Sequence, residues 1–142
     1  MDKLVTVVGA GLAGSECALQ LAKRGVAVRL FEQRPSRPSP AHHTDLFAEL
    51  VCSNSLKSLK PETAAGLLKT ELTKMSSVLL DVARRTSVPA GGALAVNRVD
   101  FSREVTRLIE TNPLIDVVRE EVTSIPEGPC VIAAGPLCSD AL

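Results

Sequence analysis

The sequence contains no tryptophan or tyrosine and only three phenylalanines in 142 residues. Its charge is balanced, with 16 basic and 16 acidic side chains. A protein that binds single-stranded nucleic acid by itself needs aromatic stacking platforms and excess positive charge, so this chain is not expected to be a stand-alone module of that kind. No apolar run approaches the roughly 20 residues that span a bilayer, and no membrane segment is expected.

The N-terminal stretch MDKLVTVVGAG has no charged-then-apolar region that ends in a cleavage site, so we expect a cytoplasmic protein and not an exported one. The four cysteines form no C-x-x-C pair: Cys17, Cys52, Cys130 and Cys138. A chain of this length can form one domain with a core and does not need disulfides to fold, so reduced thiols are expected. No zinc-ligand spacing is present, and no metal site is predicted.

The N-terminal segment predicts a strand, a helix and a second strand. LVTVV at 4–8 is a short β-branched run typical of a buried strand. Apolar side chains then recur at helical spacing until Gly25, which ends the helix. VAVRLFE at 26–32 is the next strand. This βαβ unit implies a parallel sheet, so the predicted fold class is α/β and Rossmann-like.

The loop GAGLAG between the first strand and the helix places Gly9, Gly11 and Gly14 in G-x-G-x-x-G spacing. Glu32 stands at the end of the second strand. The glycine pattern alone is weak, but its position between a strand and a helix, with Glu32 at the end of the next strand, predicts a dinucleotide-binding site. The first glycine permits a tight turn, the second lets backbone approach a pyrophosphate, and the third lets helix and strand pack closely. Glu32 can accept hydrogen bonds from the adenosine ribose.

Two positions outside this loop extend the candidate cofactor site. Arg34 could reach the adenosine or the pyrophosphate, although an exposed loop arginine is an equal alternative. A late strand ends in Ala-Ala-Gly at Gly135, which favours FAD over NAD without deciding between them. The first turn of the helix adds backbone N–H groups. The predicted cofactor-binding residues are Gly9, Ala10, Gly11, Leu12, Ala13, Gly14, Glu32, Arg34 and Gly135.

The middle of the chain predicts a loop and a long helix. Residues 33–45 hold three prolines and no periodicity, which is typical of a functional loop. Apolar residues at steps of three and four predict one amphipathic helix over 65–82, with its stripe in the core. The Gly91-Gly92 pair could approach a flavin or could only turn the chain. The other predicted elements are a strand within 88–96, a helix from an Asp100 N-cap to Glu110, one bent or two short strands over 115–125, and a strand over 129–136.

Cys52 follows an apolar run and precedes Ser-Asn-Ser, and the residues alone leave three interpretations open. It could be a packing thiol, as we expect for the other three cysteines. It could be a metal ligand with Asp45 and the His42-His43 pair, although adjacent histidines normally point apart. It could also be a reactive thiol, because Ser-Asn-Ser would cap a short helix over 53–60, and a thiol at a helix N-terminus has a lowered pKa.

Eight short segments, spread over nearly the whole chain, together carry a resemblance to a known family. They are GAGLAGSE (9–16), FEQRP (31–35), PAHHTD (40–45), ELVCSNSL (49–56), GLLKTE (66–71), VPAGGALAV (88–96), DFS (100–102) and AAGP (133–136). In this order they resemble the N-terminal part of the folate- and FAD-dependent tRNA uracil-5-methyltransferases, which are similar to the larger glucose-inhibited-division flavoproteins. The chain departs from that family at Ala134, where threonine is usual, and at Asn97, where aspartate is usual.

The resemblance implies a glutathione-reductase-type FAD-binding domain over residues 1–142, incomplete because the remaining catalytic and tRNA-binding part lies outside this chain. It implies methylation at C5 of a T-loop uridine in tRNA. Methylenetetrahydrofolate would be the carbon donor, FAD the cofactor and NAD(P)H the reductant. It places Cys52 in the active site as the catalytic residue, and the 142-residue chain alone is expected to be inactive.

Two alternatives remain. One is a flavoprotein that modifies the wobble uridine of tRNA, as glucose-inhibited-division proteins do, although CSNS differs from the cysteine motif of that family. The other is a module that binds FAD or NAD without catalysis. A cysteine substitution separates the second alternative from a methyltransferase, because a pure binding module does not need the Cys52 thiol.

Overall fold

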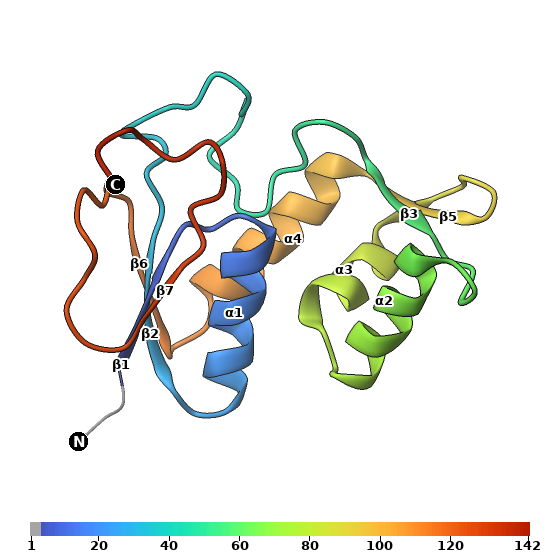
Figure 1. Cartoon of the computed structure of the whole chain (residues 1–142), viewed down its shortest axis with the longest axis horizontal. Helices are drawn as coiled ribbons and strands as arrows, with labels where there is room; N and C mark the ends of the chain where they lie inside the picture. Colours follow the sequence, from blue (N-terminus) through green and yellow to red (C-terminus); the bar gives the residue numbers. More distant parts are fainter. Residues whose placement is uncertain (1–3) are drawn as a thin grey trace.

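The computed structural model describes residues 4–142, which form two β-sheets (Figure 1). The larger sheet has four parallel strands in the order β6-β2-β1-β7. Its strands, and the two helices that pack on it, are β1 (Leu4–Val8), β2 (Ala27–Phe31), β6 (Ile115–Val118), β7 (Cys130–Ile132), α1 (Leu12–Lys23) and α4 (Arg98–Glu110). The predicted βαβ unit and its parallel sheet are therefore confirmed.

The alternation of side chains decides which face of this sheet is buried. Val7 lies beside Leu30 in the β1–β2 register, and both side chains are fully buried. Both belong to the hydrophobic core that also contains residues of α1 and α4, and these two helices lie on one face of the sheet in Figure 1. On the opposite face Arg29 Nε lies 3.0 Å from Asp116 Oδ2, and both side chains are about half exposed. Helices therefore cover one face, and the other carries a polar pair.

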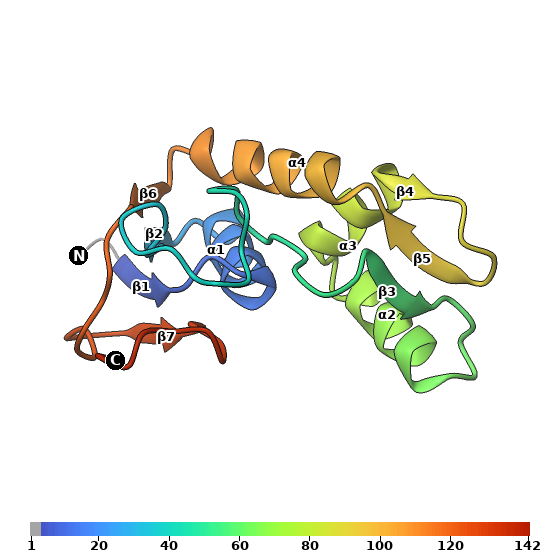
Figure 2. The same ribbon diagram turned by 90° about the horizontal axis from the view of Figure 1, so that it is seen from above.

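The second sheet is antiparallel, in the order β3-β5-β4, and no sequence pattern predicted it. The second unit consists of β3 (Ser55–Ser58), α2 (Ala64–Lys74), α3 (Val78–Arg85), β4 (Ser87–Val88) and β5 (Ala93–Val96). From the end of β5, α4 runs back to the larger sheet and so connects the two sheets (Figure 2). None of the helices in residues 4–142 has the length and hydrophobicity needed to cross a membrane.

The single helix predicted over 65–82 is wrong. Ser76 adopts a left-handed φ of 58° between α2 and α3, and Ser77 caps the start of α3. The apolar steps of three and four continue across this corner, so the periodicity conceals it. Leu68 and Met75 are 54% and 69% exposed. Leu79 and Val82 of α3 are buried in the core, whereas of the α2 part of the stripe Leu72 packs against the core only partly buried.

Three other predicted elements differ in detail. Asn97, and not Asp100, caps α4: its Oδ1 accepts two backbone N–H groups of the first helical turn, at 3.1 and 3.2 Å. Residues 53–60 contain β3 and no helix. The segment 115–125 forms one short strand, β6, and 129–136 forms only the three-residue β7. The cap at Asn97 is made by a side-chain oxygen, which the aspartate usual in the family also has.

One hydrophobic core joins the two units. Phe101 of α4 is fully buried, and its cluster includes Phe47, Val96 and Leu30 from both sides of the helix. A buried phenylalanine removes a large apolar area from water, and its loss leaves a cavity that the neighbours fill only in part. The stability of both units therefore depends on α4.

We predict that Phe101→Ala lowers the free energy of unfolding by about 3–5 kcal/mol, because it leaves a cavity where the two units meet. Urea unfolding followed by circular dichroism measures this change. Val99→Ala on the same helix is the control, since Val99 is 48% exposed and its truncation should change stability by less than about 0.5 kcal/mol. Equal losses in the two variants would contradict a core shared through α4.

Candidate functional site

An open cleft of about 310 Å³ lies at the carboxyl ends of β1, β2 and β7. In open parallel sheets this edge is where ligands bind. The predicted cofactor residues that line the cleft are Gly9, Ala10, Gly11, Leu12, Ala13, Glu32, Arg34 and Gly135. Gly14 does not line it but is buried behind the loop. The fold thus brings eight of the nine predicted cofactor residues together around one cavity.

The three glycines of the loop have different surroundings. Gly9 has φ of 96°, and a Cβ on it would lie 2.5 Å from the Ala133 carbonyl oxygen. A Cβ on Gly14 would collide with the Gly9 carbonyl. Gly11, with φ of −72°, has no atom within 4 Å of the position of a Cβ. The first and third glycines are therefore required by the fold, whereas the second leaves space on the cleft side.

The start of α1 presents unpaired backbone donors to this cleft. The N–H groups of Leu12, Ala13 and Gly14 lie in the first turn, so no carbonyl within the helix can accept their hydrogen bonds. The N-cap, Gly11, has no capping side chain, and the first turn has no acidic residue. With the positive end of the helix dipole, these N–H groups favour an anion such as a phosphate.

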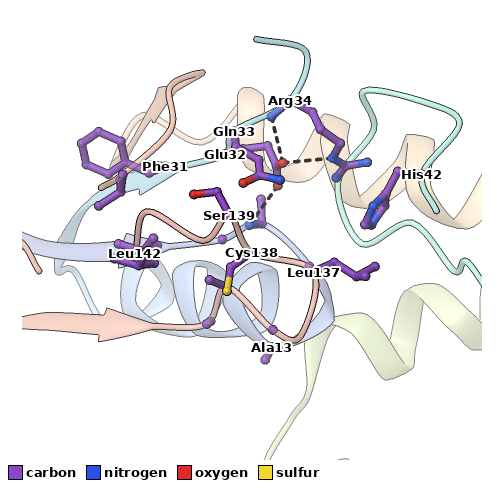
Figure 3. A pocket seen from close by; sticks show the side chains of 18 of the residues that line it. Ala13, Phe31, Glu32, Gln33, Arg34, His42, Leu137, Cys138, Ser139 and Leu142 are labelled. Atoms are coloured by element: carbon purple, nitrogen blue, oxygen red, sulfur yellow. Dashed lines mark hydrogen bonds and ion pairs between the residues drawn. The ribbon is translucent and has the colours of Figure 1, made fainter. Parts of the chain in front are cut away.

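Glu32 and Arg34 form a buried ion pair on the wall of the cleft (Figure 3). Arg34 Nε donates to Glu32 Oε1 at 3.0 Å, and the backbone N–H of Arg34 donates to the same oxygen at 3.1 Å. Glu32 Oε2 accepts from the Ala10 N–H at 3.2 Å. Arg34 Nη1 lies 3.0 Å from Oε2 of a second carboxylate, Glu49. The guanidinium is thus held between two acids, and Glu32 ties β2 to the glycine loop.

The same arginine fixes the long loop that follows β2. Its Nη1 and Nη2 donate to the backbone carbonyls of Thr44 and Leu46, at 2.8 and 3.2 Å. Arg119 supports this loop from outside, with its guanidinium 4.1 Å from the centre of the Phe47 ring. The alternative of an exposed Arg34 is wrong, because its side chain is only 5% exposed. No sequence motif pointed to Arg119.

Glu49 is the partner that sequence reasoning missed. It accepts from the backbone N–H groups of His43 and Thr44, at 2.9 and 3.2 Å, and from the Thr44 hydroxyl at 2.9 Å. It also binds Arg34. The only signal was its place in the segment ELVCSNSL. Glu49 therefore closes the loop onto the guanidinium.

This network lowers the pKa values of both carboxylates. Burial raises the pKa of Glu32, but the hydrogen bonds and charge of Arg34, together with a bond from the glycine loop, hold it below the ordinary value of 4.5. Burial also raises the pKa of Glu49, and hydrogen bonds from residues 43–44 and the charge of Arg34 bring it below 4.5. Both groups therefore contribute stability that is complete above pH 4.5 and is lost as pH falls through their folded pKa values.

His42 also lines the cleft, on the same side as Arg34 in Figure 3. Its Nδ1 is hydrogen-bonded to the Ser39 hydroxyl at 2.7 Å. Burial, and then the charge of Arg34, lower the pKa of this imidazole. The ring is therefore favoured in its neutral form next to the cleft.

Cys52 is exposed and does not line the cleft, although Val51 before it does. The helix predicted after this thiol is wrong, because the chain enters β3. Asn54 fixes the segment to β5: its Nδ2 donates to the Val96 carbonyl at 3.1 Å, and its own carbonyl accepts the Val96 N–H at 2.9 Å. The alternative of a packing thiol does not fit an exposed side chain. Among residues 4–142, no three His, Cys, Asp or Glu side chains are grouped as metal ligands.

One further expectation, for Cys138, needs correction, and the structure favours one of the two alternatives for Gly91-Gly92. Cys138 is exposed and lines the cleft, so it is not a packing residue. Gly91 has φ of 60° in the turn between β4 and β5, and neither Gly91 nor Gly92 lines the cleft. In this structure the glycine pair turns the chain.

Comparisons with known proteins give consistent results. The family model described as "Glucose inhibited division protein A" matches residues 4–138. The chain is 62% identical over 138 residues to the methylenetetrahydrofolate--tRNA-(uracil-5-)-methyltransferase TrmFO of Rubrobacter xylanophilus, covering 97% of this chain and 31% of that protein. The protein of the same name from Anoxybacillus flavithermus is 59% identical, with 97% and 32% covered. The chain thus spans about a third of the length of these curated relatives.

The fold is similar to that of solved structures of low sequence identity. Aquifex aeolicus GidA in its form I crystal has a TM-score of 0.69 at 16% identity, over 90% of this chain and 21% of that chain. The p-nitrophenol 4-monooxygenase PnpA of Pseudomonas putida has a TM-score of 0.51 at 18% identity, over 89% and 34%. With the parallel sheet and the glycine loop, these likenesses show the Rossmann-like fold of FAD-binding domains.

We predict that Arg34→Met lowers the free energy of unfolding at pH 7 by about 3–5 kcal/mol, because it leaves two acids without their buried partner. The loss should shrink below pH 4.5, since the carboxylates of the variant take up protons more readily than those of the wild type. Urea titrations from neutral to acidic pH measure both effects.

Arg37→Met is the matched control, because Arg37 pairs with Glu121 from a side chain that is 54% exposed. An exposed pair of this kind contributes less than about 1 kcal/mol, so the control should remain close to the wild type at every pH. A pH-independent loss in Arg34→Met would show that the guanidinium acts by packing and not by charge.

Proposed function

Because this chain belongs to the family described as glucose inhibited division protein A, we propose that it is the FAD-binding portion of a methylenetetrahydrofolate-dependent tRNA (uracil-5-)-methyltransferase. The observation that carries the proposal is the 62% identity to a curated enzyme of that name. Activity, substrates and partners are proposed for a protein of the relatives' length, acting in the cytoplasm. The likeness to Aquifex aeolicus GidA extends only to the fold, so it does not favour the wobble-uridine alternative.

The cleft fits a dinucleotide cofactor. The free N–H groups at the start of α1 would donate to a pyrophosphate, and the open space beside Gly11 would allow the phosphates to approach the backbone. Glu32 supplies carboxylate oxygens at the end of β2, where a ribose hydroxyl can donate. Gly135 offers backbone at the end of β7 with φ of 69°. When bound, FAD supplies the redox chemistry that reduces the transferred carbon, with NAD(P)H as the source of electrons.

We assign the reactive thiol to Cys52. A thiolate that adds at C6 of uracil makes C5 enolate-like, so that this carbon can attack the one-carbon unit from methylenetetrahydrofolate, whose bond to the folate nitrogen breaks as the unit is transferred. Loss of the C5 proton then expels the thiolate from C6 and restores the uracil ring. Cys52 is exposed, and it directly follows Val51 on the cleft wall, so a tRNA base can reach it from outside the protein. The backbone bonds of Asn54 to Val96 keep the segment in place.

We predict that the purified chain binds FAD weakly, and that Gly11→Ala weakens this binding by about a further tenfold or more, because the added methyl group occupies the approach path of the pyrophosphate. Titration of FAD with the protein, followed by the change in flavin fluorescence, measures the binding. Gly92→Ala is the matched control: a Cβ there meets only the end of the Lys60 side chain, at 3.7 Å. The far-ultraviolet spectrum of both variants should equal that of the wild type.

Equal flavin binding by Gly11→Ala and Gly92→Ala would contradict the proposed pyrophosphate position. A well-folded chain that binds no flavin but binds NADH in a parallel titration would identify NAD as the ligand and overturn the assignment to FAD.

In a protein of the relatives' full length, we predict that Cys52→Ala reduces methyl transfer to tRNA on the order of a hundredfold or more while leaving flavin content unchanged. Incorporation of labelled methyl groups from the folate donor measures the activity. Cys130→Ala in strand β7 is the control and should keep wild-type activity. Full activity in Cys52→Ala would favour a binding role for this part of the molecule.

A further inference from the structure

Glu16 of α1 accepts three hydrogen bonds from the start of α3. The donors are the Ser77 hydroxyl at 3.0 Å, the Val78 N–H at 3.0 Å and the Leu79 N–H at 2.8 Å. Gln20, one turn further along α1, donates to Glu16 Oε1 at 2.8 Å and to the Ser76 carbonyl at 2.9 Å. The corner between α2 and α3 is therefore held by two side chains of α1.

This contact connects the cofactor cleft with the second unit. Glu16 lies in the second turn of the helix that begins at the glycine loop. On the other side, α3 packs against α1, α4 and β5. Strand β5 pairs with β3 and binds Asn54, two residues after Cys52. A rotation of α3 on α1 would therefore move the Cys52 segment relative to the cleft.

The Glu16 carboxylate fixes the orientation of α3 on α1 in a way that apolar packing cannot. Leu79, Leu80 and Val82 of α3 are buried, but hydrophobic contact is not directional and tolerates rotation. Hydrogen bonds from N–H groups to a charged acceptor are stronger and directional, and a negative charge at a helix N-terminus is favourable. The Ser77 hydroxyl donates to Glu16 while it accepts from the Leu80 N–H at 3.2 Å, so the cap of α3 is tied into the contact.

We propose that Glu16 is a positioning residue that sets the angle between α1 and the second unit, and so holds the Cys52 segment at a defined place beside the cleft. The functional part of this statement rests on the proposed function. Glu16 touches neither the cleft nor the thiol; it acts through α3, β5 and Asn54.

Residual dipolar couplings of backbone amides test the proposal on the 142-residue chain, without flavin, folate or tRNA. In the wild type, amides of β1 and β2 and amides of β4 and β5 should fit one alignment tensor. In Glu16→Ala the two sets should need different tensors, and exchange at the Leu79 amide should accelerate by about tenfold or more. Glu16→Gln keeps the length and one acceptor oxygen, so it should show a smaller effect.

Glu104→Gln is the matched control. It removes the same charge and breaks a 3.1 Å ion pair between Arg85 of α3 and α4, but it does not touch backbone donors. It should keep the single tensor. A single tensor in Glu16→Ala would overturn the proposal, and so would faster amide exchange throughout β1 and β2, which would show that Glu16 only stabilises the fold. FAD binding, measured separately by titration, reports on the proposed function alone.

Discussion

The buried guanidinium of Arg34 is the interaction on which the cleft depends. It binds the acid at the end of β2, the acid at position 49 and two backbone carbonyls of the intervening loop. An arginine can do this because its planar group offers five donors in a fixed arrangement and stays charged when buried. Glu32 is held in turn, and its second oxygen fixes the glycine loop through Ala10. One side chain therefore holds the end of β2 and the loop that follows it, and through Glu32 it is connected to the glycine loop.

Local patterns predicted the part of the fold that local geometry determines. The strand, glycine loop, helix and second strand are contiguous, so spacing alone places Gly9, Gly11 and Glu32 at one edge of a parallel sheet. The antiparallel sheet escaped prediction because its strands have only two to four residues and because β3 pairs with β5 over a long sequence separation, as Ser55 does with Ala95. The periodicity of 65–82 was misleading, because it continues through a corner that Glu16 and Gln20 hold from another helix.

The candidate site shows the same division. The position of Glu32 at the end of the second strand identified it as a candidate cofactor residue. The burial of Arg34 could not be predicted, because its second acidic partner, Glu49, lies 15 residues away in an aperiodic loop. Serine and asparagine after Cys52 indicated a helix start, yet the same side chains form local turns that lead into a strand. The hydroxyl of Ser53 accepts the Ser55 N–H at 3.1 Å in such a turn. Tertiary pairing with β5 decides between the two outcomes.

The placement of the second unit between neighbouring strands has a consequence for how the chain folds. Strands β2 and β6 are adjacent in the parallel sheet, yet residues 32–114 separate them in sequence. Closing so long a loop is entropically costly while the loop is unstructured, and pairings of this kind form slowly. An inserted unit that has already folded brings its two ends together, which shortens the effective loop. We therefore expect β6 to pair with β2 late in folding, after residues 32–114 have folded, although these residues contribute no strand to the parallel sheet.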